Sequence, residues 1–216
     1  MRIGELSAAS GVPLPTIKYY LREGLVPAGS PTARNQADYG PEHLARLRLV
    51  RALIEVGGLS VAAARDVLRA VDDPDLHAHE LLGVAHDATV AKPVGRRDTA
   101  EWRLARDAVD RLVGERHWLV HADAPALDQA ADALAAFATL GATDFAPLVD
   151  VWAEAAEKVA RQEVAAVTAR ESRAATVEGA VIGTVIGEVL FNALRRLAQE
   201  HASAAHYGVS PEQRPC

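Results

Sequence analysis

The 216-residue chain contains a single cysteine, Cys216, at its C-terminal end. One cysteine excludes a disulfide within the chain and a metal site built from several thiolates of one chain. Aromatic residues are also scarce, at 5% of the sequence, beside abundant Ala, Val and Leu. This composition favours helices packed on helices over a β-sandwich, so we predict a mainly α-helical fold.

Long hydrophobic runs are missing as well. The longest, Gly179–Gly187, lies between Glu178 and Glu188 and is far shorter than the roughly 18 residues that cross a bilayer. No positively charged and then apolar leader opens the chain. We therefore expect a cytoplasmic protein without a membrane partner.

Motifs of catalysis and metal binding are equally scarce. The sequence has no nucleophile elbow, phosphate-binding glycine loop or strand-borne nucleophile, and we predict no enzyme activity and no cofactor. His117 and His121 are four residues apart, and His77 and His79 are two apart. Because the residues between His117 and His121 indicate that a helix has already ended, we expect no metal site there.

Charge is distributed unevenly along the chain, whose formal net charge is −6. Residues 1–71 hold nine basic and six acidic residues, and the remainder holds 14 basic and 23 acidic ones. A basic head on an acidic body is typical of a nucleic-acid-binding module joined to a segment with another task. The excess in the head is small, so chance fluctuation remains an alternative explanation.

The first 75 residues are divided by prolines into short elements. Apolar spacing predicts helices over residues 3–9 and 14–23, and the turn between them consists of Gly11, Val12 and Pro13. Two short helices joined by such a turn form a helix-turn-helix. Residues 25–39 are predicted to be a loop or short hairpin, and further helices are expected from Pro41 to the Gly57-Gly58 pair and over 61–71.

Longer helices are predicted in the rest of the chain, over residues 76–86, 99–117, 126–140, 144–170 and 172–204. The least structured part is expected at residues 87–97, where proline and glycine cluster, and the last eight residues are expected to fray. The predicted fold is thus an N-terminal helix-turn-helix with a hairpin, followed by an all-helical bundle.

The head holds a set of short motifs at fixed spacing: Arg2-Ile3-Gly4-Glu5-Leu6, Gly11-Val12-Pro13, Thr16-Ile17-Lys18-Tyr19-Tyr20, Glu23-Gly24-Leu25-Val26-Pro27, Tyr39-Gly40, the Leu44/Leu47/Val50 helix and the Gly57–Ser60 step. This set resembles the opening of MerR-type transcription regulators. It covers about a third of the chain and implies a winged helix-turn-helix DNA-binding domain over residues 1–73. A connecting helix and linker would follow at 74–98, then a helical dimerisation and effector domain at 99–208 and a flexible tail at 209–216.

The resemblance implies that residues 14–23 form the recognition helix and that residues 25–39 form the wing. The DNA-binding residues that we predict are Thr16, Lys18, Tyr19, Arg22, Arg34, Tyr39, Arg46 and Arg48. This chain departs from the family at Lys18, where arginine is common, so we expect a phosphate or single-acceptor contact there. The wing also lacks the family's Tyr-Arg pair, and Arg34 is expected to take over its phosphate contact. Tyr20 is expected in the core.

The resemblance implies that the remaining helices dimerise and sense. Of the modes of sensing known in the family, thiol-based sensing is excluded by the lone cysteine, and a β-rich drug-binding barrel is excluded by the lack of strand patterns, so a helical effector domain is expected. Residues 177–201 are faintly similar to the dimerising helices of TetR-type regulators. Gly179, Gly183 and Gly187 lie four apart on one helical face and predict a closely packed partner helix, from the same chain or from a second copy.

Five aromatic residues are candidates for the walls of an effector pocket or, alternatively, for anchors of the bundle core. They are Trp102, Trp118, Trp152, Phe137 and Phe145. The resemblance thus implies a homodimeric regulator that binds double-stranded promoter DNA and remodels or occludes the promoter for RNA polymerase, and the helical domain is a candidate binder of a small apolar effector. The alternative is an interaction protein whose helical domain binds a protein partner while the head anchors it to DNA.

Overall fold

The computed structural model describes residues 1–33, 36–76, 78–89 and 97–208. Its contacts divide the chain into two compact units. The first unit joins residues 1–64 to the chain from Ile182 onward, and the second contains Arg65–Val181. Four positions or segments for which we made predictions lie outside the described residues: Arg34, His77, residues 90–96, and the tail 209–216 with Cys216.

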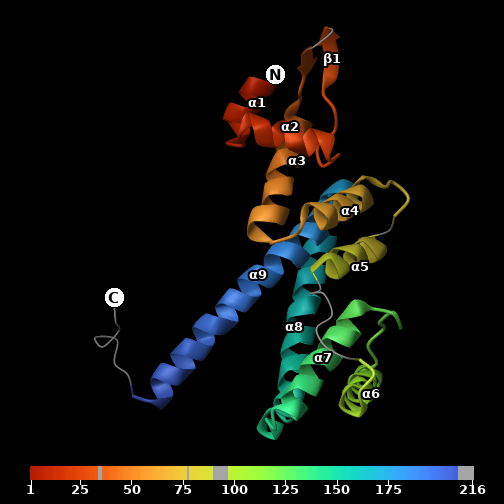
Figure 1. The fold of residues 1–216 in the computed structure, drawn as a ribbon, viewed down its shortest axis with the longest axis vertical. Coiled ribbons are helices and arrows are strands. Elements are labelled where there is room, and N and C mark those ends of the chain that lie inside the picture. Colours follow the sequence, from red (N-terminus) through yellow and green to blue (C-terminus); the bar gives the residue numbers. More distant parts are fainter. Residues whose placement is uncertain (34–35, 77, 90–96, 209–216) are drawn as a thin grey trace. The chain divides into compact units, whose positions relative to one another are not determined.

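The N-terminal part has the elements expected of a winged helix-turn-helix (Figure 1). They are α1 (Ile3–Ser10), α2 (Leu14–Arg22), β1 (Ser30–Ala33), β2 (Gln36–Asp38), α3 (Pro41–Arg51), the π-helical turn η1 (Ala52–Val56) and α4 (Val61–Asp72). The prediction of four short helices and one hairpin is confirmed. The π-helical geometry of η1 has no counterpart in the sequence-based expectation.

A small core holds α1, α2 and α3 together. Leu6, Ile17, Leu25, Leu47 and Leu53 are fully buried in it. Leu6, Ile17 and Leu47 lie on the inward faces of α1, α2 and α3, while Leu25 follows α2 and Leu53 lies in η1. The expectation that Tyr20 belongs to this core is confirmed, since it is 6% exposed.

The hairpin is short and polar. Ser30 pairs with Asp38 and Pro31 with Ala37, and an irregularity follows between Pro31 and Ala33. The backbone N–H of Tyr39 donates to the carbonyl oxygen of Met1 at 2.8 Å, which fixes the base of the hairpin to the segment before α1. A Cβ at Gly29 would collide with the Tyr39 ring and the Asp38 carbonyl, so glycine is required at this close approach.

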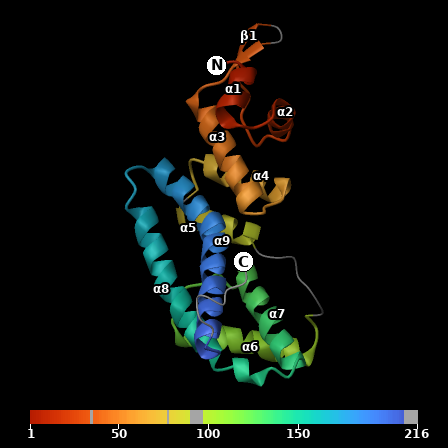
Figure 2. The same cartoon turned by 90° about the vertical axis from the view of Figure 1, so that its left-hand side faces the viewer.

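The regular elements of the second unit are all helices in the described residues (Figure 2). It contains α5 (Ala78–Thr89), α6 (Ala100–Glu115), α7 (Pro125–Thr139), the 3₁₀ turn η2 (Thr143–Phe145), α8 (Leu148–Thr168) and the start of α9 (Arg173–His206). The mainly α-helical prediction is confirmed. Residues 87–89, expected in a linker, instead form the last turn of α5, where the Thr89 hydroxyl donates to the His86 carbonyl at 2.8 Å.

Helices α6 and α7 pack against each other around a compact apolar cluster. Ala105 and Val109 of α6 meet Leu127 and Ala131 of α7. Thr99 caps the N-terminus of α6, because its hydroxyl accepts from the backbone N–H of Trp102 at 3.1 Å, and α7 begins at Pro125. A threonine cap and a proline in the first turn are common at helix N-termini, and both residues can be recognised in the sequence.

Helix α9 is the longest element, at 34 residues. By length and composition alone, α9 is long and apolar enough to cross a membrane, and it is the one helix of this kind among the described residues. Its apolar stretch continues past Glu188 into Val189–Leu194. The apolar run Gly179–Gly187 in the sequence is therefore shorter than the apolar helix that contains it. A long helix that packs in a soluble protein passes the same test, so this finding is weak evidence for a membrane.

Candidate nucleic-acid interface

The turn between α1 and α2 is fixed by local hydrogen bonds. Helix α1 ends at Gly11, whose φ of 68° lies in the left-handed region and whose N–H donates to Ser7 O at 3.0 Å. Glycine adopts this conformation without the steric cost that a side chain would bring. The Ser7 hydroxyl donates to Val12 O at 2.6 Å across the turn. These contacts set the angle at which α2 leaves α1.

Helix α2 presents one polar face to solvent. Lys18, Tyr19 and Arg22 are exposed, and their spacing of one and three residues puts them on the same side. Ile17 and Tyr20 point into the core on the other side. The Arg22 guanidinium lies 5.9 Å from the centre of the Tyr19 ring, within cation–π range. Thr16 is half-buried at the edge of this face.

Tyr20 serves the fold rather than this face. Burial raises the pKa of its hydroxyl, and the nearby negative charge of Glu55 raises it further. The hydroxyl therefore stays protonated at physiological pH. This environment agrees with the interpretation of Tyr20 as a core residue.

The basic residues of α3 differ in what they contact. The Arg48 side chain is exposed, with no ion-pair or hydrogen-bond partner among the described residues. Arg46 is half-buried and already interacts within the chain. Arg51 donates twice to the Glu55 carboxylate, from Nε at 3.0 Å and from Nη2 at 2.8 Å, and to Ser10 O at 3.3 Å. Arg48 is thus the α3 arginine best placed to bind a phosphate.

The wing is tied to the start of α1 by a second arginine. Arg2 Nη1 donates to the Thr32 hydroxyl at 2.6 Å, and Arg2 Nε lies 3.6 Å from the Asp38 carboxylate. The strands themselves are exposed, apart from Ala37, which is half-buried. The outer surface of the hairpin is therefore exposed to solvent and lies beside the positively charged guanidinium of Arg2.

Tyr39, predicted as a DNA contact, is 8% exposed and packs edge-on against His43 with ring centroids 5.2 Å apart. We therefore assign it to the support of the wing. His43 was missed at the sequence level, although its place directly after Tyr39-Gly40-Pro41 is a usable signal. Its Nδ1 accepts from the Gly40 N–H at 3.0 Å, and its Nε2 lies 3.4 Å from Ala28 O.

An exposed basic and aromatic face on the second helix of a helix-turn-helix, beside a hairpin, defines a winged helix-turn-helix DNA-binding module. Comparison with known proteins agrees: residues 1–71 match the model of the MerR HTH family regulatory proteins. These residues belong to the MerR family of helix-turn-helix regulators, and the chain is classed with the DNA-binding transcription regulators.

Two relatives extend this result. The HTH-type transcriptional regulator ZntR homolog of Haemophilus influenzae is 42% identical over 50 residues, which is 23% of this chain and 37% of that protein. A crystal structure of SCO5550 from Streptomyces coelicolor A3(2), provisionally described as a transcriptional regulator, is similar over 97% of this chain and 99% of the other. The TM-score is 0.70 and the identity 38%, so the likeness includes the helical remainder.

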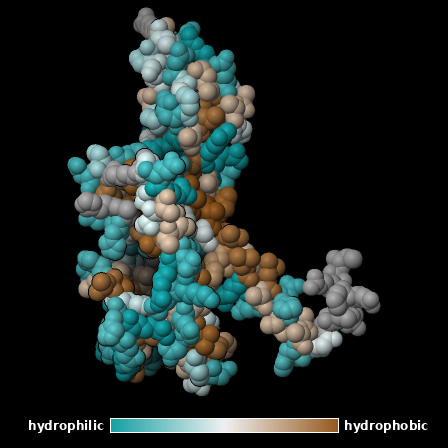
Figure 3. Space-filling view, turned by 180° about the vertical axis from the view of Figure 1, so that it is seen from behind, coloured by the Kyte–Doolittle hydropathy of each residue, from teal (hydrophilic) through white to brown (hydrophobic). Residues whose placement is uncertain are grey.

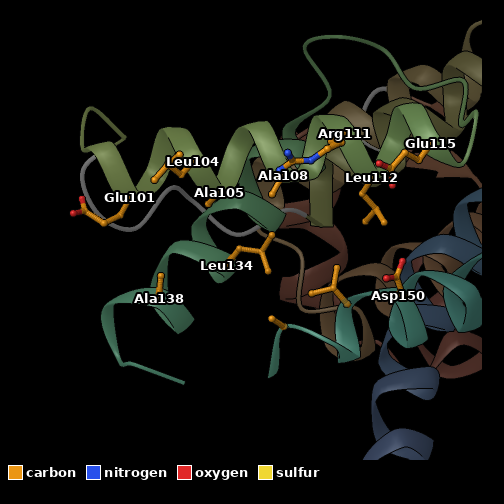
Figure 4. Close-up of a pocket in the computed structure, with 12 residues that line it drawn as sticks. Glu101, Leu104, Ala105, Ala108, Arg111, Leu112, Glu115, Leu134, Ala138 and Asp150 are labelled. Carbon is orange, nitrogen blue, oxygen red and sulfur yellow. The ribbon is translucent and has the colours of Figure 1, made fainter. Parts of the chain in front are cut away.

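The five aromatic candidates for an effector pocket lie in three places. Phe137 stacks on Phe145 with centroids 4.9 Å apart, and Trp152 lies 6.2 Å from Phe137. Trp102 donates from Nε1 to Asp132 at 2.7 Å. Trp118 lies beside Arg116, with its buried Nε1 unbonded. None of the five lines the pocket between α6, α7 and the start of α8 (Figure 4), so an aromatic effector site stays a prediction.

The histidine pairs give no ligand cluster in the described part of the chain. Helix α6 ends at Glu115, and His117 has a φ of 54°, so His117 and His121 do not share a helical face. The expected end of the helix before His121 is confirmed.

The glycine face of α9 is partly used within the chain. Gly179 is buried, and a Cβ there would collide with the Arg170 side chain. Val185, on the same helix, packs so closely on Gly57 that a Cβ at Gly57 would overlap it. Gly183 and Gly187 are half-buried. The close neighbours of Gly179 and Val185 are thus residues of this chain.

Proposed function

We propose that this protein is a homodimeric regulator that binds promoter DNA through α2 and the wing. The observation that carries the proposal is the exposed face of Lys18, Tyr19 and Arg22 on the second helix of the module. A helix of this kind enters the major groove and reads bases from its exposed side, while flanking basic residues neutralise phosphates. Thr16 and Lys18 are the base-reading candidates, and Arg22, Arg48 and the wing's Arg34 bind phosphates.

A second copy is needed because one head has few contacts. One recognition helix covers a few base pairs, and each phosphate contact contributes a modest, salt-sensitive amount of binding energy. Two linked heads on a pseudo-palindromic site make the second contact intramolecular, which raises the effective affinity. Dimerisation thereby converts weak contacts into specific binding.

The surface that we propose for the dimer is the C-terminal half of α9. Leu190, Leu194 and Leu197 are 59%, 53% and 62% exposed, and apolar side chains follow this helix in Figure 3. Together with Gly183 and Gly187 they continue a spacing of four and three residues, which is the seam of a coiled coil. We retain Gly183 and Gly187 in the interface and leave out Gly179, which Arg170 covers.

In this proposal, residues 1–73 form the DNA-binding domain, residues 74–98 connect the domains, and residues 99–208 form the domain that dimerises and senses. The dimer bends and untwists the promoter or occludes it, and RNA polymerase responds indirectly. A small-molecule effector bound to the helical part controls this state, and the protein works in the cytoplasm. Deformation of the DNA would be offset by the phosphate contacts of the two heads.

The test is fluorescence anisotropy of the purified chain with DNA from upstream of its own gene and with a scrambled fragment. The proposal predicts tighter binding to the upstream fragment, with Lys18→Ala changing the preferred bases. Equal affinity for the two fragments would contradict a sequence-specific regulator. It would favour the alternative, in which the head anchors the chain to DNA and the helical part binds another protein.

A further inference from the structure

The two strands of the wing have no hydrophobic core of their own. Ser30–Ala33 is exposed along its whole length, and in Gln36–Asp38 the middle residue, Ala37, is half-buried between two exposed ones. A two-stranded hairpin is at best marginally stable by itself in water. The place of this hairpin in the head therefore depends on contacts with residues outside its strands.

The backbone of Arg2 is held at the start of α1. Arg2 is the N-cap residue of this helix, with an extended backbone (φ −78°, ψ 160°), and its carbonyl oxygen accepts from the Leu6 N–H at 2.9 Å. Its own N–H donates to the Glu5 carboxylate at 2.7 Å. These two hydrogen bonds fix the point from which the Arg2 side chain extends to the hairpin.

The Arg2 side chain reaches both strands of the hairpin. Its Nη1 donates to the Thr32 hydroxyl of β1 at 2.6 Å, and its Nε lies 3.6 Å from the Asp38 carboxylate of β2. A planar guanidinium, with N–H donors along several of its edges, suits such a bridge, whereas the ammonium group of a lysine is a point charge. A charged donor also makes a stronger hydrogen bond than a neutral one. Arg2 thus ties the hairpin to a helix that lies far from it in the sequence.

We propose that Arg2 is a positioning residue for DNA binding, which holds the wing in a fixed place relative to the recognition helix. The turn after α1 sets the direction of α2, and Arg2 at the start of α1 sets the wing, so α1 connects the two elements that contact DNA. A wing that has to be ordered on the DNA costs affinity, because the entropy of ordering is lost on binding. The inference rests on the DNA binding proposed above and adds the residue that prepares the wing for it.

The first test separates a positioning role from a phosphate contact by salt dependence. Thr32→Val removes the acceptor of the Arg2 hydrogen bond and changes neither the charge nor, to any large extent, the shape of the side chain. In anisotropy with upstream DNA its affinity should fall about fivefold to tenfold, while the slope of log affinity against log salt stays native, because no phosphate contact is lost. Ser30→Ala, which removes another exposed hydroxyl of β1, is the matched control and should bind like the native chain.

Variants of Arg2 test whether Thr32 acts through this arginine. Arg2→Lys keeps the positive charge but cannot bridge the two strands, so it should bind as weakly as Thr32→Val. The double variant should bind no more weakly than either single one, because both substitutions remove the same bridge. Native affinity of Arg2→Lys would show that charge alone is needed at this position, and additive losses would show that Thr32 contacts DNA by itself. Either result would overturn the proposal.

The second test measures the wing of the full chain without DNA. In Thr32→Val the NMR order parameters of the Ala33 and Ala37 amides should fall, while that of Ile17 in α2 and the melting temperature should stay native. Unchanged order at Ala33 and Ala37 would overturn the proposal.

The two tests also separate this inference from the proposed function. A chain that prefers upstream DNA, with native affinity in Thr32→Val, contradicts the role of Arg2 alone. A chain without any preference for upstream DNA contradicts the proposed regulator, and the order parameters then decide by themselves whether Arg2 holds the wing.

Discussion

Arg51 illustrates how a basic side chain in the head can serve the fold rather than the DNA. Its guanidinium is held by Glu55 and by the Ser10 carbonyl, so it connects the end of α1 to α3. The hydrogen bond with Arg51 lowers the pKa of the Glu55 carboxyl and raises that of Arg51. Arg22 and Arg48, by contrast, have no ion-pair partner among the described residues.

The first prediction compares these arginines in DNA binding. Arg22→Ala or Arg48→Ala should each reduce the slope of log affinity against log salt by about 0.9, because one phosphate contact and its released counterion are lost. Arg51→Ala should leave the slope unchanged but lower the melting temperature. The slope is measured by anisotropy over a salt series. If Arg22→Ala and Arg48→Ala both kept the native slope of log affinity against log salt, the proposed DNA face would be contradicted.

The second prediction concerns Asp132 in the second unit. Its carboxylate accepts from Arg97 Nη2 at 2.9 Å and from Trp102 Nε1 at 2.7 Å. The bond from Arg97 contributes most to holding the pKa of Asp132 below the usual aspartate value, and the bond from Trp102 adds to it. A carboxyl with a lowered pKa stabilises the fold when ionised, above its unfolded pKa. This contribution is lost as the pH falls through the folded pKa.

Asp132→Asn should therefore reduce the free energy of unfolding at pH 7, and the difference from the native sequence should shrink as the pH falls below about 4. Urea unfolding followed by tryptophan fluorescence measures both. Asp107→Asn, on the exposed side of α6, is the control and should change little. A deficit of Asp132→Asn that stays constant down to pH 3 would show that the ion pair is not its source.

At the scale of elements, the helices and the hairpin were predictable and the packing between them was not. Proline, glycine and capping residues mark the ends of α1, α2, α6 and α7, so their bounds follow within two residues of the expectation. The π-helical turn η1 and the contact of Val185 with Gly57 depend on which segments meet in space. Periodicity along one segment carries no such information.

The site shows the same division. Lys18, Tyr19 and Arg22 were predictable as an outward face because their neighbours Ile17 and Tyr20 are apolar or aromatic at core spacing. The burial of Tyr39 on His43 and the use of Arg51 by Glu55 were not, since both depend on contacts that a linear pattern leaves open.

The third prediction tests the fit of α9 on η1 in the first unit. Gly57→Ala should destabilise the protein, because the new methyl overlaps Val185 and the Leu53 carbonyl in a closely packed site. The expected cost is about 1–3 kcal/mol in urea unfolding. Gly83→Ala is the matched control, since nothing lies within 4 Å of a Cβ at this exposed position of α5.

The control should be stabilising by roughly 0.5–1 kcal/mol, because alanine is favoured over glycine inside a helix. Equal stability of Gly57→Ala and the native sequence would mean that Val185 does not pack on this turn.

At the scale of the whole molecule, the chain combines a basic head with a helix whose apolar seam is open. The fourth prediction follows from the seam. Leu194→Glu should give monomers, because it places a charge in the proposed interface of both copies. Leu119→Glu, at a leucine that is 98% exposed, should leave the assembly unchanged. Sedimentation velocity distinguishes the two, with circular dichroism as the check on folding.

Gly183→Leu probes the other end of the same seam. A leucine there should push the facing helix away and also weaken the dimer, since a half-buried glycine leaves room for close approach. A folded dimer in both Leu194→Glu and Gly183→Leu would contradict the proposed interface, and α6 would be the next helix to test.

The most direct test of the central claim is the stoichiometry of the complex with upstream DNA. Sedimentation velocity of the chain with a labelled fragment should show two chains on one duplex, and Leu194→Glu should bind the same fragment weakly and without preference over a scrambled one. One chain per duplex with full specificity, or the same affinity for both fragments, would contradict a dimeric sequence-specific regulator.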